Sequence, residues 1–330
     1  MKEHFIADFA AHENETLVTY YAAAQKQVRS TKSGSVYLAV TLCDSTGQVD
    51  ARMWDNVQQA ASQFDQGDIV KVQAQVCRFD TKLQLKIDKI RRAAENEYDL
   101  GDFLPKTAKN VDEMWAELDR YVESFRDPHL KALMRSFLDD PEIAGALRQS
   151  PAAKTLHHAW LGGLLEHIVS LLGICDLAAS HYKEVHRDLL LTGAMLHDIG
   201  KLQELRWGTG FEYSIEGTLV GHISIGFSLV DKKIALLPDF PPALRVLIEH
   251  MILSHHGKYE FGSPKLPMTP EALLLSFLDD MDAKMQIVRS EFARNEASGR
   301  PASQFTDWVR AMERPLLNSA ALLADQKTKL

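Results

Sequence analysis

The segment TGAMLHDIGKLQE, residues 192–204, places a histidine and an aspartate side by side in an otherwise apolar stretch. In a helix over 187–199, both His197 and Asp198 would lie on the side that carries the leucines and alanine of that helix. A buried carboxylate is costly unless it is paired or bound to a cation. The pair therefore indicates either a satisfied core histidine beside its partner or part of a metal site.

Other metal-capable side chains favour the second reading. They lie on the apolar faces or at the ends of separate helical segments, and together with the pair they make seven candidate ligands: His167, His197, Asp198, His222, His255, His256 and Asp279. Imidazole mixed with carboxylate suits Mn, Fe, Co or Zn, and suits Mg less well. Because no cysteine accompanies these groups, the pattern argues against a structural zinc site.

The helical elements that must position these ligands begin at Asp99, where the hydrophobic period changes. Helical patterns cover 110–125, 128–138, 141–148, 157–182, 187–199, 222–236, 241–256, 270–294 and 303–325. Gly- and Pro-rich stretches at 207–222 and 257–270 read as long loops, and loops of that length are usually functional. Since strand signals are almost absent, we expect an all-α domain of about 200 residues.

Residues 16–92 alternate with period two instead. Turn signals at 44–47, 65–68 and 80–82 separate four or five short strands, which predicts a small barrel or sandwich. A helical segment at Val57–Phe64, between the third and fourth strands, favours an OB-type barrel. The predicted fold class is a multidomain chain, a small all-β OB-type barrel followed by an all-α domain.

Composition limits the class of protein. Hydrophobic residues make up 45% and charged residues 25% of the 330 residues, as in ordinary soluble globular proteins. We find no basic segment followed by an apolar run at the start, and no apolar stretch near about 20 residues. The three widely spaced cysteines, Cys43, Cys77 and Cys175, fit a reducing compartment. We therefore expect a soluble cytoplasmic protein with no membrane partner.

The charge is distributed unevenly. Residues 16–95 hold 11 Lys/Arg against 8 Asp/Glu, although the chain as a whole has a net charge of −8. Alternation places six aromatic and cationic side chains on the outside of the barrel: Tyr37, Arg52, Trp54, Lys71, Phe79 and Lys86. Such a set predicts a platform for single-stranded nucleic acid, worth about 1–3 kcal/mol per stacked base. The alternative is that Trp54 and Phe79 pack under a loop or against the helical domain.

The ligand order resembles a known superfamily. His167, the pair His197-Asp198 thirty residues later, and then Asp279 resemble the HD-domain metal-dependent phosphohydrolases. In that superfamily these four groups hold one metal ion. The additional His222, His255 and His256 resemble the version with two ions, which implies that Asp198 bridges them; manganese is our first expectation.

With the barrel included, residues 16 to 290 resemble the YhaM-type 3′→5′ exoribonucleases of bacteria. The motifs are PAAKTLHHAWLGGLLEH (151–167), HDIGK (197–201), SHHG (254–257), EFGSP (260–264) and DDMDAKM (279–285). The resemblance implies an OB-fold nucleic-acid-binding domain (16–95), a linker with a helical connector (96–150) and an HD-type phosphohydrolase domain (151–295). An N-terminal extension (1–15) and a C-terminal helical tail (296–330) lie outside the resemblance.

Five further residues near the candidate ligands each have two possible roles. Lys201, which would act beside Asp198 in catalysis, follows it by about one helical turn and either contacts a non-bridging phosphate oxygen or is a solvated surface lysine. Asp282 either orients a ligand histidine or pairs with Lys284. His157 and His158 either bind substrate phosphate or lie at a helix start.

Three functions follow from these patterns. The first is a metal-dependent 3′→5′ exonuclease that hydrolyses single-stranded RNA, and also single-stranded DNA, to nucleoside 5′-monophosphates. The second is an HD phosphohydrolase acting on nucleotides or cyclic dinucleotides, with the barrel as a regulatory or assembly module. The third is a nucleic-acid-binding protein without catalysis. An oligomer is compatible with all three.

Overall fold

The computed structural model describes residues 2–31, 34–79, 82–154, 160–207, 210–297 and 299–328. The predicted residues His157 and His158 lie outside the described residues. The chain forms two compact units, Met1–Ala108 with Arg206–Glu212, and Lys109–Leu205 with Tyr213–Leu330. Each unit is described by itself.

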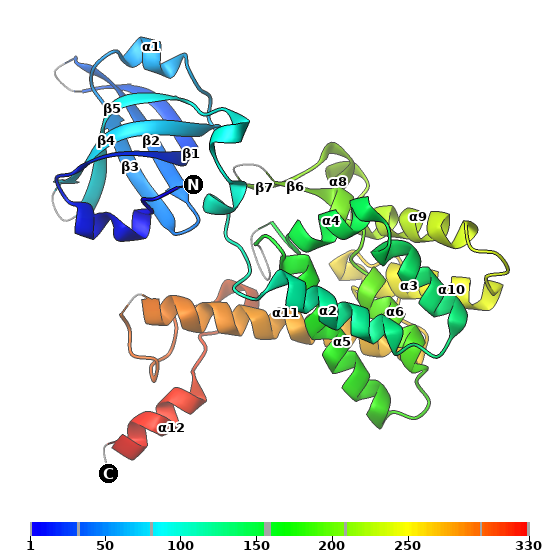
Figure 1. The fold of residues 1–330 in the computed structure, drawn as a ribbon. Coiled ribbons are helices and arrows are strands. Elements are labelled where there is room, and N and C mark those ends of the chain that lie inside the picture. Colours follow the sequence, from blue (N-terminus) through cyan, green and yellow to red (C-terminus); the bar gives the residue numbers. More distant parts are fainter. Residues whose placement is uncertain are drawn as a thin grey trace. The chain divides into compact units, whose positions relative to one another are not determined.

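The first unit contains a closed five-stranded barrel (Figure 1). Its elements are β1 (Thr16–Ser30), β2 (Val36–Asp44), β3 (Gly47–Met53), α1 (Val57–Ala61), β4 (Ile69–Phe79) and β5 (Lys82–Arg92). The strands close in the order β1-β2-β3-β5-β4, with β3 and β5 parallel and the other pairs antiparallel. The predicted OB-type barrel is confirmed, including the helix between its third and fourth strands.

Apolar side chains that alternate with polar ones along the strands fill the interior of this barrel, as the sequence predicts. Leu38, Val40 and Leu42 of β2 all face the core, while the residues between them are partly exposed. A 3-10 helix, Ile6–His12, adds the buried ring of Phe9 to the same core. Two more 3-10 turns, Glu95–Glu97 and Leu100–Asp102, follow the last strand.

The second unit is mostly helical (Figure 1). Its helices are α2 (Val111–Glu123), α3 (Pro128–Leu138), α4 (Pro141–Gln149), α5 (Gly163–His181), α6 (Arg187–Leu196), α7 (Lys201–Glu204), α8 (Ile215–Leu219), α9 (His222–Ala235), α10 (Pro242–Ser254), α11 (Pro270–Ala297) and α12 (Ser319–Thr328). The first three begin where their sequences predict, because the side chains of Asn110, Asp127 and Asp140 accept hydrogen bonds from the first free backbone N–H groups.

Helix α5 lies at the centre of this unit and packs against α2, α4, α6 and α11. It is also long and apolar enough to cross a membrane by length and composition, so the expectation that no such stretch exists is wrong. In the structure, 56% of its 18-residue apolar window is buried inside the protein. Its leucines, such as Leu164 and Leu171, form the hydrophobic core.

Two sequence predictions for residues after 200 are wrong. The predicted loop 207–222 contains a hairpin of β6 (Leu205–Trp207) and β7 (Phe211–Tyr213), and then α8. The predicted helix 303–325 begins only at Ser319. Pro315 explains that late start, because proline lacks an N–H and disfavours helical backbone at the residue before it. Before it, the chain forms a 3-10 turn at Arg310–Met312.

Candidate metal centre and nucleic-acid interface

Two groups of metal-capable side chains lie inside the helical unit. His167 on α5, His197 at the end of α6 and Asp279 on α11 form the first group. The second group consists of His222 at the start of α9 and His255 and His256 at the end of α10. Within each group the ligand atoms lie within 4.8 Å of one another. All six residues were predicted as ligands from the sequence.

Asp198, the seventh predicted ligand, lies between the two groups. Its Oδ2 is 3.3 Å from His197 Nε2 and 4.0 Å from His167 Nε2. Its Oδ1 is 3.4 Å from His222 Nε2 and 3.7 Å from His255 Nε2. One carboxylate oxygen therefore faces each group, which is the arrangement that a bridging ligand requires.

Backbone carbonyls orient three of the histidines. The Nδ1–H of His197 donates to Ala194 O at 3.0 Å, that of His255 to Ile252 O at 2.7 Å, and that of His256 to Phe261 O at 2.9 Å. A carbonyl oxygen only accepts, so Nδ1 must hold the ring proton. In the neutral rings the lone pair is then on Nε2, the nitrogen used for metal binding.

Carboxylates orient the other two histidines. His167 Nδ1 lies 2.9 Å from Asp282 Oδ2, and Ser170 Oγ donates to the other oxygen of Asp282 at 2.6 Å. His222 contacts Glu204 Oε1 twice, through its backbone N–H at 2.9 Å and through Nδ1 at 3.0 Å. These contacts fix the ring orientation and raise the basicity of the ligand nitrogen.

The contact with His167 agrees with the reading in which Asp282 orients a candidate ligand histidine. Lys284 pairs instead with the exposed Asp280, at 2.5 Å. Glu204 and Ser170 were missed in the sequence. Glu204 lies one turn after Lys201 in KLQE, and that spacing within the motif was the one available signal.

Gly200 allows the His-Asp turn to approach α9. A Cβ atom on Gly200 would lie 2.0 Å from His222 O and 2.6 Å from Gly226 N, both backbone atoms that cannot move aside cheaply. The helix α6 ends at Leu196, earlier than predicted, and residues 197–200 form turns. The glycine of HDIGK therefore brings Asp198 close to His222.

The electrostatics of the first group favour a positive charge at its centre. Burial opposes ionisation of Asp198, but Lys201 and His197 outweigh it and hold its pKa well below the ordinary value. Burial also lowers the pKa of His197, but Asp198 and Asp279 outweigh it and raise the pKa to about 10. Since Ala194 O already holds the Nδ1 proton, the second proton would occupy Nε2, where a metal ion can replace it.

The second group is electrically different. Burial, together with the nearby His197, lowers the pKa of His255 well below its ordinary value. Burial and His222 lower the pKa of His256 as well. The Nε2 atoms of His222 and His255 are buried and have no hydrogen-bond partner among the residues that the structure describes. A buried polar atom without a partner is costly, and a bound cation would satisfy both nitrogens.

The donor set fits divalent first-row metal ions. It consists of five imidazoles and two carboxylates, without thiolate. Ligand atoms about 2.0–2.2 Å from a common ion lie about 3–3.5 Å apart when they are neighbours in its coordination sphere. In the first group His167 Nε2 and Asp279 Oδ1 are 3.1 Å apart, and His197 Nε2 and Asp279 Oδ1 are 3.6 Å apart.

Lys201 is part of this site and not a solvated surface lysine. Its Nζ donates to Asp198 Oδ2 at 2.6 Å, and its side chain is only 12% exposed. Burial lowers the pKa of Lys201, but Asp198 outweighs it and raises the pKa above the ordinary value. Lys201 therefore holds a permanent positive charge at the edge of the cluster.

On the barrel, four of the predicted outer residues gather on β2, β3 and the end of β4. The rings of Tyr37 and Trp54 stack with centroids 4.8 Å apart. The Arg52 guanidinium lies 5.8 Å from the Tyr37 ring centroid and 5.4 Å from that of Phe79. Lys86 is the direct neighbour of Arg52 on β5. We call these five residues the aromatic face.

The aromatic face is open and hollowed. Trp54 is 41% exposed and Phe79 is 55% exposed, so neither is packed under a loop. Two hollows, of about 150 and 530 Å³, lie on this face, and Arg52 lines both. Exposed rings beside cations suit the stacking of unpaired bases.

Lys71 does not belong to the aromatic face, and this part of the prediction is wrong. Its Nζ lies 5.0 Å from the Tyr20 ring centroid and 3.7 Å from Glu97 Oε1. Lys71 lies near the start of β4, opposite Tyr20 of β1 and Arg91 of β5, whereas Phe79 lies at the far end of the same strand. Alternation separates inside from outside in a closed barrel, but it does not tell which side of the barrel an outward residue occupies.

Two family models match this chain. Residues 164–284 match the HD domain. Residues 25–93 match an OB-fold nucleic acid binding domain. The HD match covers the predicted ligands from His167 to Asp279, and the OB match covers the aromatic face. The HD domain indicates a metal-dependent phosphohydrolase, and the OB-fold domain indicates nucleic-acid binding.

The chain is also similar to parts of solved structures. One is a murine DNA binding protein bound with double-stranded DNA, with 15% identity, a TM-score of 0.24, and coverage of 30% of this chain and 52% of that one. The second OB-fold domain of replication protein A from Methanococcus maripaludis has 21% identity, a TM-score of 0.21, and coverage of 26% and 91%. An aspartyl tRNA synthetase from Entamoeba histolytica has 11% identity, a TM-score of 0.24, and coverage of 53% and 43%. The chain thus spans about half the length of the murine protein.

Proposed function

We propose that this protein is a metal-dependent 3′→5′ exonuclease that hydrolyses single-stranded RNA, and also single-stranded DNA, to nucleoside 5′-monophosphates. The observation that supports it most is Asp198, whose two oxygens face two groups of inward-pointing histidine Nε2 atoms. The aromatic face supports a nucleic-acid substrate, and the 3′ polarity rests on the resemblance to the exoribonuclease family.

The residues of the first group together with Asp198 would hold one divalent ion, and Asp198 with the second group would hold another. Two such ions supply Lewis-acid activation of water and stabilise charge on the oxygens at phosphorus. The protein contributes the fixed ring orientations, through the Nδ1 contacts of all five histidines. It also contributes a buried setting, where electrostatic interactions are stronger than in water.

Lys201 contributes a buried ammonium group beside Asp198 Oδ2. A cation at this place can hold a non-bridging phosphate oxygen and offset the negative charge that grows at phosphorus in the transition state. Its remaining 12% of exposed side chain keeps it within reach of a substrate.

The aromatic face supports single-stranded nucleic acid, because the flat faces of bases are free for stacking only in unpaired strands. Tyr37, Trp54 and Phe79 offer rings, while Arg52 and Lys86 offer positive charge for phosphates. A protein of this design would hold a strand mainly by its bases and backbone, without a strong sequence preference.

A time course with 5′-labelled single-stranded RNA and Mn²⁺ tests the proposal. We expect a ladder that shortens from the 3′ end and releases nucleoside 5′-monophosphates. Asp279→Asn should abolish the ladder, whereas Asp280→Asn, on the next residue of the same helix but exposed, should leave it unchanged.

The same assay can reject the proposal. Intact RNA together with turnover of free nucleotides or cyclic dinucleotides would indicate the second hypothesis, an HD phosphohydrolase with a regulatory barrel. Binding of RNA without hydrolysis by any divalent cation would indicate a nucleic-acid-binding protein without catalysis.

A further inference from the structure

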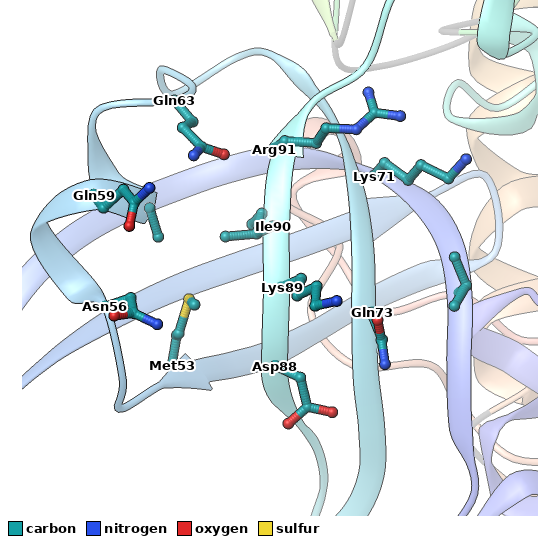
Figure 2. Close-up of a pocket in the computed structure, with 12 residues that line it drawn as sticks. Met53, Asn56, Gln59, Gln63, Lys71, Gln73, Asp88, Lys89, Ile90 and Arg91 are labelled. Carbon is teal, nitrogen blue, oxygen red and sulfur yellow. The ribbon is translucent and has the colours of Figure 1, made fainter.

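The barrel has a further hollow, separate from the two on the aromatic face. It lies beside α1, β4 and β5 (Figure 2) and has a volume of about 450 Å³. It shares no lining residue with the two hollows beside Arg52. Its volume lies within the about 300–1,000 Å³ typical of small-ligand sites.

A β-bulge supplies the charged side chains of this hollow. The register changes from Gln73 opposite Lys89 to Ala74 opposite Ile87, so Asp88 is an extra residue in β5. The bulge turns both Asp88 and Lys89 outward, while Ile87 and Ile90 stay buried. Bulges commonly re-aim side chains at functional sites.

The cations of the hollow are not all neutralised. Lys71 and Arg91 share Glu97, at 3.7 and 2.8 Å. Lys89 makes no ion pair or side-chain hydrogen bond with any residue that the structure describes. Positive charge therefore exceeds negative charge here, and Lys89 is available to an anionic group.

Four carboxamides also line the hollow. Asn56, Gln59 and Gln63 come from α1 and its two ends, and Gln73 comes from β4 on the other side of β5 (Figure 2). Within the described part of the chain, none of the four makes a side-chain hydrogen bond. Each carboxamide offers a donor and an acceptor side by side, as the edge of a nucleobase does.

Apolar side chains line the hollow as well, namely the buried Met53 and Ile90 and the exposed Val18. Apolar side chains of this kind suit contact with the flat face of a base. Asp88 also lines the hollow, and its carboxylate can accept from an exocyclic amino group of a base.

We propose that this hollow binds a nucleotide, with its phosphate on Lys89 and its base against the carboxamides and the apolar side chains. The nucleotide can be one unit of a bound strand or a free mononucleotide, since both present the same chemistry. The site does not depend on the metal centre or on exonuclease activity.

Binding to the full-length protein in excess EDTA tests the site without hydrolysis. The probes are fluorescent single-stranded RNA of about 12 nucleotides, by anisotropy, and the four nucleoside 5′-monophosphates, by calorimetry. Lys89→Glu should weaken binding of the RNA by about tenfold and reduce the slope of log affinity against log salt by about one. Lys89→Arg should restore most of the affinity.

Lys232→Glu, the same charge change on exposed α9, is the matched control and should bind like the wild type. The affinities for single-stranded RNA homopolymers of A, C, G and U are compared as well. Gln59→Ala combined with Gln73→Ala should remove the differences among these four affinities, because the contacts to the bases are lost. Thermal unfolding of each variant checks that it is folded.

Each outcome decides the proposal. Loss of mononucleotide binding in Lys89→Glu shows a site for free nucleotides. Loss confined to RNA shows a site within the path of a bound strand. If Lys89→Glu and the double glutamine variant bind both probes as tightly as Lys232→Glu, the hollow is not a nucleotide site.

Discussion

The polar groups of the metal centre and those of the aromatic face differ in how much their surroundings constrain them. His167, His197 and Asp198 are at most 3% exposed, and each has a defined hydrogen-bond partner. On the barrel, Trp54 and Phe79 are about half exposed and are held mainly by ring and cation contacts. A buried site is thus built in advance by many contacts, while an open face leaves its side chains free to adapt to a strand.

The largest expected effect follows from substituting Asp198, which faces both histidine groups of the buried site. Asp198→Asn removes the carboxylate charge that faces both histidine groups. We expect bound metal to fall and phosphodiester hydrolysis to drop by at least about 10²–10³-fold, because charge stabilisation at phosphorus is lost. Metal analysis and hydrolysis rates measure the two effects.

The variant Lys201→Gln separates the role of Lys201 from that of its partner Asp198. It leaves all seven candidate ligands in place, so metal content should stay near the wild-type value while hydrolysis falls. If Lys201→Gln instead abolishes metal binding, then Lys201 has a structural role, and the hypothesis that it contacts the phosphate is wrong.

The next largest effect concerns the carboxylates behind the ligands. Asp282→Asn removes the carboxylate charge beside His167 Nδ1, and Glu204→Gln removes the one beside His222 Nδ1. Each should lower Mn²⁺ affinity by about 10–100-fold. Calorimetry gives the affinities, and the exposed Asp280→Asn is the control.

A double-mutant test makes this prediction specific. In a His222→Ala background the second group is disabled, so Asp282→Asn should still weaken metal binding, whereas Glu204→Gln should add little. Equal effects of the two changes in that background would show that they act through general stability.

A smaller effect is expected on the open face. Trp54→Ala should weaken binding of single-stranded RNA by about 1–3 kcal/mol, since one stacking ring is lost. Anisotropy titrations in EDTA measure this, with the exposed Trp308→Ala as a matched control. Unchanged affinity would mean that the exposed rings of this face do not bind bases.

The same contrast explains which features could be predicted from the sequence. All seven candidate ligands lie on apolar helix faces or helix ends, where a polar residue needs a reason, so their positions were informative. Lys71 was misplaced because exposed residues have no such constraint and a closed barrel has more than one outer side. The partners Glu204 and Ser170 depend on tertiary contacts that no periodicity encodes.

Element boundaries show the same limit. The helices with a capping aspartate or asparagine were placed within a residue or two, since the cap is a local signal. The hairpin of β6 and β7 was missed because each strand has only three residues, too few for alternation to appear. Asp282 had two possible partners in sequence, and only the packing of α11 on α5 decides between them.

The smallest expected effect concerns the buried ammonium group of Lys2 in the barrel unit, and it is measured as a change in the free energy of unfolding. Burial lowers the pKa of Lys2 to about 8, although Asp44 at 3.2 Å opposes this shift. Its Nζ also donates to Tyr20 O at 2.6 Å and lies 3.7 Å from the Tyr21 ring centroid. Below pH 8 both folded and unfolded chains bind the proton; between about pH 8 and 10.5 only the unfolded chain does, so this group makes stability rise with pH there. Burial raises the pKa values of Tyr21 and Cys43, and these two groups oppose the rise in stability at high pH. The contribution of Lys2 must therefore be isolated by difference.

The variant Lys2→Met isolates this contribution. Between pH 7 and 9, its free energy of unfolding, measured by denaturant titration, should increase by about 1 kcal/mol less than that of the wild type. Parallel pH profiles would show that the ammonium of Lys2 keeps its ordinary pKa and that Asp44 and Tyr20 compensate fully for its burial.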